Sequence, residues 1–270
     1  MPTDPTAWLP QAALLFAAAL VGGALNSLSG GGSFLTFPAL LLTGVPSVNA
    51  NATNTVALWP SGLAILSVYR RELRAVPHRL LLVVPSVLGG WLGAAVLLRT
   101  PSATFAQLVP YLLLAATLLF AFSGPIAARL GTVSAAAGPS WRVRVVVALL
   151  QLAIATYGGF FGGGIGILML GTLSLMGVRN VHQLNALRMV LSTSINGVAV
   201  VTFVLAQAVL WPHAVVMCVG AIVGGYAGAH GVRRLPPRVV RGLVITIGLG
   251  MAVYFFVRGS QPPVTWPRTW

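Results

Sequence analysis

The sequence predicts an all-α integral membrane protein, a helical bundle made of two inverted repeats. Three observations lead to this prediction: the composition, a series of long apolar runs, and an internal duplication. The chain of 270 residues is 57% hydrophobic and 7% charged, with a mean hydropathy of +0.91. Soluble domains have about 25% charged residues. Lipid, rather than water, must therefore surround most of this chain.

Ten segments of the chain are apolar enough to enter a membrane. A helix that spans the membrane needs about 20 apolar residues. The eight long runs are 11–29, 50–69, 80–98, 106–122, 145–161, 185–205, 213–232 and 242–257. Two short segments, 33–43 and 165–176, each follow three consecutive glycines. The residues before the first run include Asp4 and no basic residue. We therefore expect that run to be a membrane segment and not a signal peptide.

The second half of the chain repeats the first in four places. The matched pairs are 30–32 with 162–164, 44–45 with 177–178, 51–52 with 185–186, and 89–94 with 224–229. The offset between matched positions drifts only from 132 to 135 residues. Duplicated halves are common in transporters. The predicted organisation is a first membrane repeat, a linker and a second membrane repeat, at 1–122, 123–144 and 145–270.

The distribution of Arg among the loops predicts the orientation of the two halves, because positively charged loops stay in the cytoplasm. If each glycine-broken segment crosses once, the halves are parallel and the loop Arg residues divide nine to six. If both pieces cross, or form a re-entrant hairpin, the halves are inverted and the division is twelve to three. The stronger bias favours inverted halves, with both termini in the periplasm.

The two glycine clusters predict helix breaks at membrane depth. Lipid cannot hydrogen-bond the N–H and C=O groups that a break exposes, so a break must be buried in protein or line a cavity. The helices that start near Ser33 and Ile165 would direct their N–H groups and positive dipole ends at such a cavity. That arrangement is suited to an anion. The alternative is that the glycines only allow close helix packing or a tight turn at the membrane interface.

Small polar side chains gather near both clusters. Asn51, Thr55 and Leu58 share one helix face by their spacing, and so do Asn185, Arg188 and Ser192. Amide and hydroxyl groups there could bind oxyanion oxygens, or could simply bond one helix to another. The candidate substrate-binding residues are Asn26, Gly31, Gly32, Ser33, Asn51, Asn54, Gly163, Gly164, Asn185 and Arg188.

Arg188 is the one Arg well inside a predicted segment. An Arg at the centre of a membrane helix costs about 2.5–3.5 kcal/mol on insertion scales. The sequence has only two acids, Asp4 and Glu72, both expected to face water. A substrate anion could therefore be the partner of Arg188, although a side chain near the start of its helix could also extend to the interface.

Other glycines and the tryptophans favour structural roles. Gly89, Gly93, Gly220, Gly224 and Gly228 have four-residue spacings that are typical of close helix packing. Trp59, Trp91, Trp141 and Trp211 are expected to be interface anchors.

Several function classes are excluded. The net charge of +14 comes from Arg residues that mostly lie between apolar runs, and no single element gathers them as a nucleic-acid-binding face would. The single cysteine, Cys218, excludes a disulfide framework and a Cys-based metal site. We find no metal-ligand cluster and no common nucleophile or phosphate-loop motif. We therefore expect that the protein is not an enzyme and that it binds no metal and no cofactor.

The motifs around the breaks resemble the TauE/SafE sulfite exporter family. In the first half these are Asn26-Ser-Leu-Ser-Gly-Gly-Gly-Ser-Phe, Pro38, Gly44 and Asn51-Ala-Thr-Asn-Thr. In the second half they are Gly158-Gly-Phe-Phe-Gly-Gly-Gly-Ile-Gly, Gly177 and Asn185-Ala. The resemblance covers residues 20–257. It implies a membrane permease for sulfite, a sulfonate or a related small anion.

The function that the sequence predicts is transport of a small anion bound between two glycine-broken helices. The expected setting is a bacterial inner membrane, crossed many times, with the lipid bilayer, the anion and a possible second copy of the chain as partners. The alternatives are a transporter of another small solute and a non-transporting membrane assembly subunit.

The inverted arrangement can be tested by the accessibility of single cysteines in a Cys218→Ser background. We expect cysteines placed in the loops 70–79 and 233–241 to react from the same, cytoplasmic side, because both loops are Arg-rich. Membrane-impermeant maleimide on sealed vesicles of both orientations gives the measurement. Reaction of the two loops from opposite sides would contradict the inverted arrangement.

Overall fold

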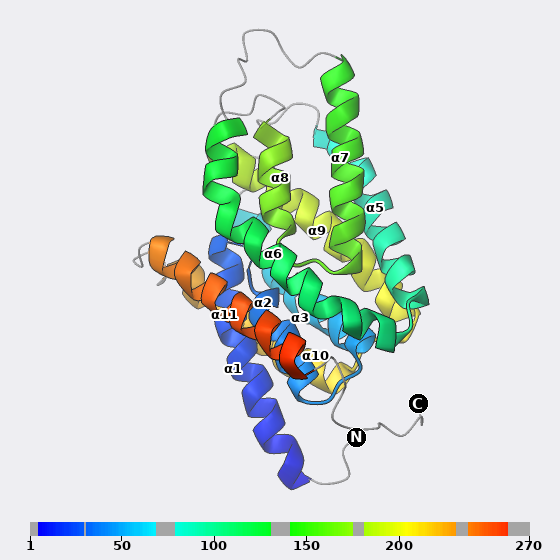
Figure 1. Ribbon diagram of the computed structural model, residues 1–270, viewed down its shortest axis with the longest axis vertical. Helices are drawn as coiled ribbons and strands as arrows, with labels where there is room; N and C mark the ends of the chain where they lie inside the picture. Colours follow the sequence, from blue (N-terminus) through cyan, green and yellow to red (C-terminus); the bar gives the residue numbers. More distant parts are fainter. Residues whose placement is uncertain are drawn as a thin grey trace.

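The computed structural model describes residues 5–29, 31–68, 79–130, 141–174, 181–230 and 237–258. All regular structure in these residues is helical, which confirms the all-α class. The helices are α1 (Pro5–Ser29), α2 (Ser33–Leu42), α3 (Ser47–Val68), α5 (Arg79–Arg99), α6 (Ser102–Leu130), α7 (Trp141–Phe160), α8 (Ile165–Ser174), α9 (Val181–Leu205), α10 (Trp211–His230) and α11 (Pro237–Arg258). Figure 1 shows them as one bundle.

Six of these helices are long and apolar enough to cross a membrane, so the chain is a multi-span membrane protein. The spans lie in α1, α5, α6, α7, α9 and α10. Eight long segments were predicted, and the other two correspond to α3 and α11. Both have 22 residues, but α3 begins with a run of Asn and Thr, and in α11 the stretch whose side chains the structure describes, Gly242–Val257, is shorter than a full span.

The two short segments form short helices, and helices also extend into the predicted linker. α2 and α8 have ten residues each, as expected for short helices after the glycine clusters. Ten residues span about 15 Å, half of the hydrocarbon core. Helices occupy both ends of the predicted linker 123–144, because α6 continues to Leu130 and α7 begins at Trp141. The helix formers Ile126, Ala127 and Ala128 outweigh the turn signal of Gly124-Pro125.

The helix contacts repeat when the two halves are exchanged. Exchanging α1 with α7, α2 with α8, α3 with α9, α5 with α10 and α6 with α11 turns the most extensive contact, α1 on α10, into the next, α7 on α5. It likewise turns α3 on α10 into α9 on α5, and α2 on α11 into α8 on α6. The pairs α3–α9 and α6–α11 map onto themselves. The duplication in sequence is therefore also a duplication in packing.

The two most extensive helix contacts depend on small residues. A Cβ on Gly224 of α10 would overlap the carbonyl of Leu20 in α1, and one on Gly220 would lie 2.7 Å from the carbonyl oxygen of Phe16. In α5, a Cβ on Gly89 would lie 2.6 Å from Ala155 of α7, and Gly93 meets the same helix. The packing role predicted for these four glycines is confirmed.

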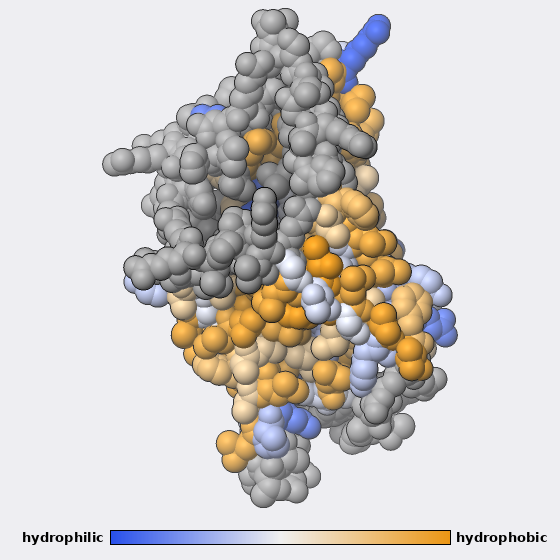
Figure 2. Space-filling view, turned by 60° about the vertical axis from the view of Figure 1, so that its left-hand side comes forward, coloured by the Kyte–Doolittle hydropathy of each residue, from blue (hydrophilic) through white to orange (hydrophobic). Residues whose placement is uncertain are grey.

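Large apolar side chains remain on the outside of the bundle. Leu88 and Trp91 of α5 are each 55% exposed, and Tyr226 of α10 is 70% exposed. Figure 2 shows that hydrophobic residues cover most of the coloured face. Exposed apolar surface on this scale is what a lipid-facing protein presents.

The polar start of α3 fastens the first half to the second. The Nδ2 group of Asn49 donates to the carbonyl of Ala208 at 2.9 Å, and that of Asn51 donates to the carbonyl of Phe160 at 3.0 Å. The hydroxyl oxygen of Thr53 accepts a hydrogen bond from the N–H of Leu210 at 3.0 Å. These bonds satisfy backbone groups where α7 ends and where α9 connects to α10. They explain why a membrane helix begins with so many amides and hydroxyls.

Thr53→Val should therefore destabilise the protein, because it leaves the N–H of Leu210 without the acceptor it has now. The expected loss is about 1–3 kcal/mol, measured as a reduced free energy of unfolding in detergent. Thr202→Val is the matched control, since the hydroxyl of Thr202 bonds only to the carbonyl of Val198 within its own helix. Equal effects of the two variants would show that the link between α3 and Leu210 contributes little.

Candidate functional site

The second glycine cluster separates α7 from α8 through two left-handed residues. Gly162 has φ +79° and Gly164 has φ +76°, a conformation that disfavours any residue with a Cβ. The N–H groups of Phe161 and Gly162 both donate to the carbonyl of Tyr157, which closes the end of α7. The hydroxyl of Tyr157 donates to the carbonyl of Gly163 at 2.8 Å. The break is thus bonded internally, as its depth in an apolar bundle requires.

The first cluster separates α1 from α2 for a different physical reason. Gly32 has a right-handed helical backbone, with φ −58° and ψ −38°. A Cβ there would overlap the carbonyl of Gly22 in α1, and a Cβ on Gly22 would lie 2.6 Å from the side chain of Thr36. Glycine is needed here for the close approach of α2 to α1. The two similar sequence motifs therefore serve different needs.

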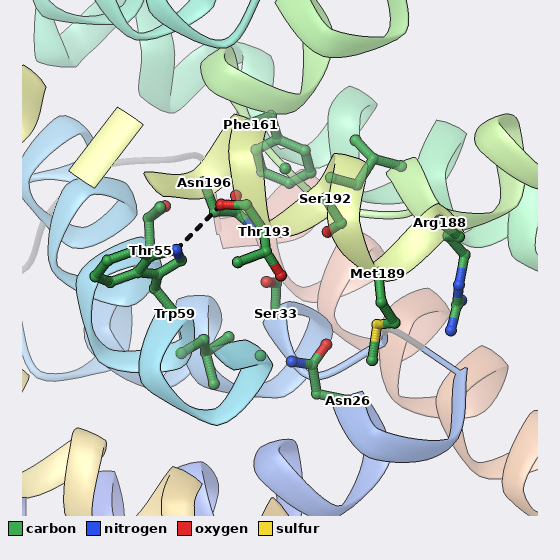
Figure 3. Close-up of a pocket in the computed structure, with 15 residues that line it drawn as sticks. Asn26, Ser33, Thr55, Trp59, Phe161, Arg188, Met189, Ser192, Thr193 and Asn196 are labelled. Carbon is green, nitrogen blue, oxygen red and sulfur yellow. Dashed lines mark hydrogen bonds between the residues drawn. The ribbon is translucent and has the colours of Figure 1, made fainter. Parts of the chain in front are cut away.

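A cavity lies between the two breaks. Its volume is about 60 Å³, room for several water molecules at roughly 10–15 Å³ each. The lining comes from the end of α1, the start of α2, the middle of α3, the α7–α8 break with the start of α8, and α9. The lining residues are Asn26, Ser33, Thr55, Leu58, Trp59, Gly62, Phe161, Gly162, Ile165, Gly166, Arg188, Met189, Ser192, Thr193 and Asn196. Figure 3 shows them in place.

The first residues of both short helices belong to this lining. Ser33 begins α2 and Ile165 begins α8. The N-terminus of a helix carries a partial positive charge. At the start of α2 the N–H groups of Phe34 and Leu35 already donate to the carbonyls of Gly31 and Gly32, so this end offers the cavity its dipole rather than those N–H groups. The two breaks thus bring two positive helix ends to one cavity. This is the convergence that the duplicated glycine motifs predicted.

The lining carries a positive side chain and, among the described residues that form it, no acid. Arg188 of α9 is 7% exposed. Gly166 of α8 makes room for it, because a Cβ at Gly166 would lie 2.9 Å from a terminal guanidinium nitrogen. Figure 3 shows Arg188 and Trp59 on opposite sides of the labelled residues. The cavity therefore has a cationic end and an aromatic end.

The candidate residues named from the sequence fall into two groups. Asn26, Ser33 and Arg188 line the cavity. The other candidates whose side chains the structure describes are not among the lining residues. The side chain of Asn51 bonds to Phe160, and that of Asn54 bonds to Ser33 at 3.3 Å and to Thr36 at 2.5 Å.

The remaining candidates are glycines and one asparagine. A Cβ on Gly31 would face Val244 of α11 at 3.2 Å, and one on Gly163 would press on the ring of Phe161 at 2.7 Å. Gly32 and Gly164 directly precede the lining residues Ser33 and Ile165. Asn185 belongs to α9, and its side chain lies outside the part that the structure describes.

Several residues of the cavity lining have no feature in the sequence that assigned them to the site. Trp59 was expected to be an interface anchor, but it is half-buried and lines the cavity. Phe161 and Met189 gave no polar signal, so composition alone could not identify them. The shared face of Thr55 and Leu58, and that of Arg188 and Ser192, did predict residues that meet here. Extending the first face by one residue would have found Trp59.

No group of three or more His, Cys, Asp or Glu that could hold a metal ion occurs in the residues that the structure describes. The cavity lining contains hydroxyls, amides, one guanidinium and apolar groups. These groups suit binding of a small solute by hydrogen bonds and charge.

Comparisons with known proteins agree with a transport role. The family model of the sulfite exporter TauE/SafE matches residues 15–255. A probable membrane transporter protein, ORF9, of Sinorhizobium sp. is 30% identical over 94% of this chain and 95% of its own length. A probable membrane transporter protein of Haemophilus influenzae is also 30% identical, over 88% of this chain and 92% of its own.

A third relative is the probable membrane transporter protein YfcA of Escherichia coli K12, which is 26% identical over 88% of this chain and 87% of its own length. No solved structure matches the chain. Since the family model spans nearly all of the chain and the relatives align over most of theirs, the chain belongs to the TauE/SafE family of membrane transporters.

Proposed function

We propose that this protein transports a small anion across a bacterial inner membrane, and that the anion binds in the cavity between the two helix breaks. The family's name supports sulfite, a sulfonate or another small organosulfur anion as the substrate. The observation that carries the proposal is the charge of the lining, because Arg188 and the first residues of α2 and α8 line the same cavity.

The positive charge of Arg188 accounts for selectivity towards anions. A buried Arg in a membrane helix is costly, about 2.5–3.5 kcal/mol, and such residues mark substrate or ion pathways. An anion beside Arg188 would gain charge-assisted hydrogen bonds from the guanidinium, and it would offset the positive charge of the cavity. A cation entering the same space would meet like charge.

The helix ends and the neutral donors would complete the binding of an oxyanion. Each helix N-terminus contributes about 0.3–1 kcal/mol towards a negative charge, and more where water is excluded. Ser33, Ser192 and Thr193 place hydroxyls in the lining, and Asn26 and Asn196 place amides there. An oxyanion has several oxygens and can accept from donors on different helices at once. Binding shared in this way depends on both halves of the protein.

We also propose that the two halves are inverted in the membrane, with both termini in the periplasm. In Figure 1, α1 runs upward in the view and its counterpart α7 runs downward. The helix contacts that repeat on exchange of the halves also support a two-fold relation between them. Inverted repeats commonly place the substrate at their interface, between discontinuous helices.

Arg188→Ala should weaken anion binding by about ten- to a hundredfold, because a hydrogen bond to a charged group is worth roughly 1.5–3 kcal/mol. Binding of sulfite and methanesulfonate to purified protein, by calorimetry, and flux into proteoliposomes give the two measurements. Arg188→Lys keeps the charge but loses the planar fork of donors. Its affinity for the anion should therefore fall between that of the native protein and that of Arg188→Ala.

Arg99→Ala is the matched control for this substitution. Arg99 is exposed at the end of α5, away from the cavity lining. Its loss should leave affinity and flux nearly unchanged. A folded Arg188→Ala protein that binds and transports as well as the native protein would refute the proposed site.

A further inference from the structure

Trp59 and Thr193 meet where the two halves of the protein cross. Asn51 and Asn185 are equivalent residues of the two repeats, 134 positions apart, and Trp59 and Thr193 are separated by the same distance. They therefore occupy equivalent positions on α3 and α9, the pair of helices that maps onto itself when the halves are exchanged. Two large rings facing each other here would collide, whereas one ring against one threonine fits.

The indole of Trp59 is fixed by two contacts with α9. Its Nε1 group donates a hydrogen bond to the carbonyl of Thr193 at 3.1 Å, drawn as the dashed line in Figure 3. Its ring lies against Gly197, where a Cβ would be 3.3 Å from both Cζ2 and Nε1. The hydrogen bond sets the direction of the ring, and the glycine sets how closely it approaches the helix. A ring held against α9 by these two contacts forms a firm wall.

That wall stands opposite the cationic end of the cavity. Arg188 and Thr193 are five residues apart on α9, so their levels along the helix differ by about 7.5 Å. An anion whose oxygens lie at Arg188 would direct the rest of its structure towards Trp59. The cavity volume of about 60 Å³ holds only a few water molecules, so each carbon added to such an extension brings it closer to the ring.

We propose that Trp59 sets the size limit of the substrate. The indole wall admits a compact oxyanion and disfavours anions that carry an organic chain. The proposal rests on the anion-binding function above and adds to it a residue that discriminates by size. Steric conflict with a fixed side chain, rather than loss of a hydrogen bond, is the source of the discrimination.

The experiment measures the affinity of purified protein for methane-, ethane- and propanesulfonate, which share a head group and differ in chain length. The native protein should bind methanesulfonate about tenfold or more tightly than propanesulfonate. Trp59→Ala should remove most of that difference by enlarging the cavity. Trp59→Phe, a milder change that also serves if the alanine variant does not fold, should remove part of it.

A substitution from the other side of the ring should act in the opposite direction. Gly197→Ala adds a Cβ that must displace the indole by a few tenths of an ångström, and we expect it to make the dependence on chain length steeper. Two controls lie outside the cavity: Trp91→Ala on the exposed face of α5, and Gly242→Ala, where a Cβ meets no atom within 4 Å. Both should leave the chain-length dependence as it is in the native protein.

The outcomes separate the two proposals. If the native protein binds these sulfonates through Arg188 and both Trp59 variants keep the native dependence on chain length, the role of Trp59 is refuted while the anion site stands. If the native protein binds no sulfonate and no sulfite, or if Arg188→Ala has no effect on binding, the proposed function fails and the size limit fails with it.

Discussion

The structure depends on the need to satisfy the backbone of two helices that break inside an apolar bundle. Lipid offers no hydrogen bonds, so each break must be enclosed by protein. α3 and α9 cross at this level and provide amides and hydroxyls, and Asn51 bonds directly to the carbonyl that ends α7. Once enclosed, the breaks direct two helix N-termini into one interior space. A buried Arg188 can then be accommodated beside Gly166, the second residue of α8 after the second break.

The two repeats share a framework but differ at the cavity. The position equivalent to Arg188 in the first repeat, by the same offset of 134, is Asn54. Asn54 bonds to Ser33 and Thr36 and holds the start of α2, whereas Arg188 contributes charge to the cavity. Trp59 and Thr193 are also equivalent positions, and they differ in size. A duplicated bundle thus brings two helix N-termini to one cavity, and single substitutions within it give the cavity one cationic end and one aromatic end.

The sequence predicted the helices and the breaks, because hydropathy and glycine triplets are local properties. It placed Ser33, Asn26 and Arg188 near one another, and the structure brings all three to one cavity. It could not show that Asn51 contacts Phe160 or that Trp59 contacts Thr193. These contacts depend on which helices cross, and local spacing does not reveal that. It expected eight long spans, and among the residues that the structure describes six helices meet the length and hydropathy of a span. α3 is not one of them, because it begins with polar residues that serve contacts within the protein.

The central claim is that an anion binds between the starts of α2 and α8 beside Arg188. The most direct measurement is anomalous scattering at the selenium edge from crystals grown with selenite, the heavier analogue of sulfite. The account predicts one strong peak inside the cavity, within hydrogen-bond distance of the Arg188 guanidinium and close to Ser33. A protein that transports sulfite but shows its selenite peak elsewhere, with the cavity holding none, would contradict the account.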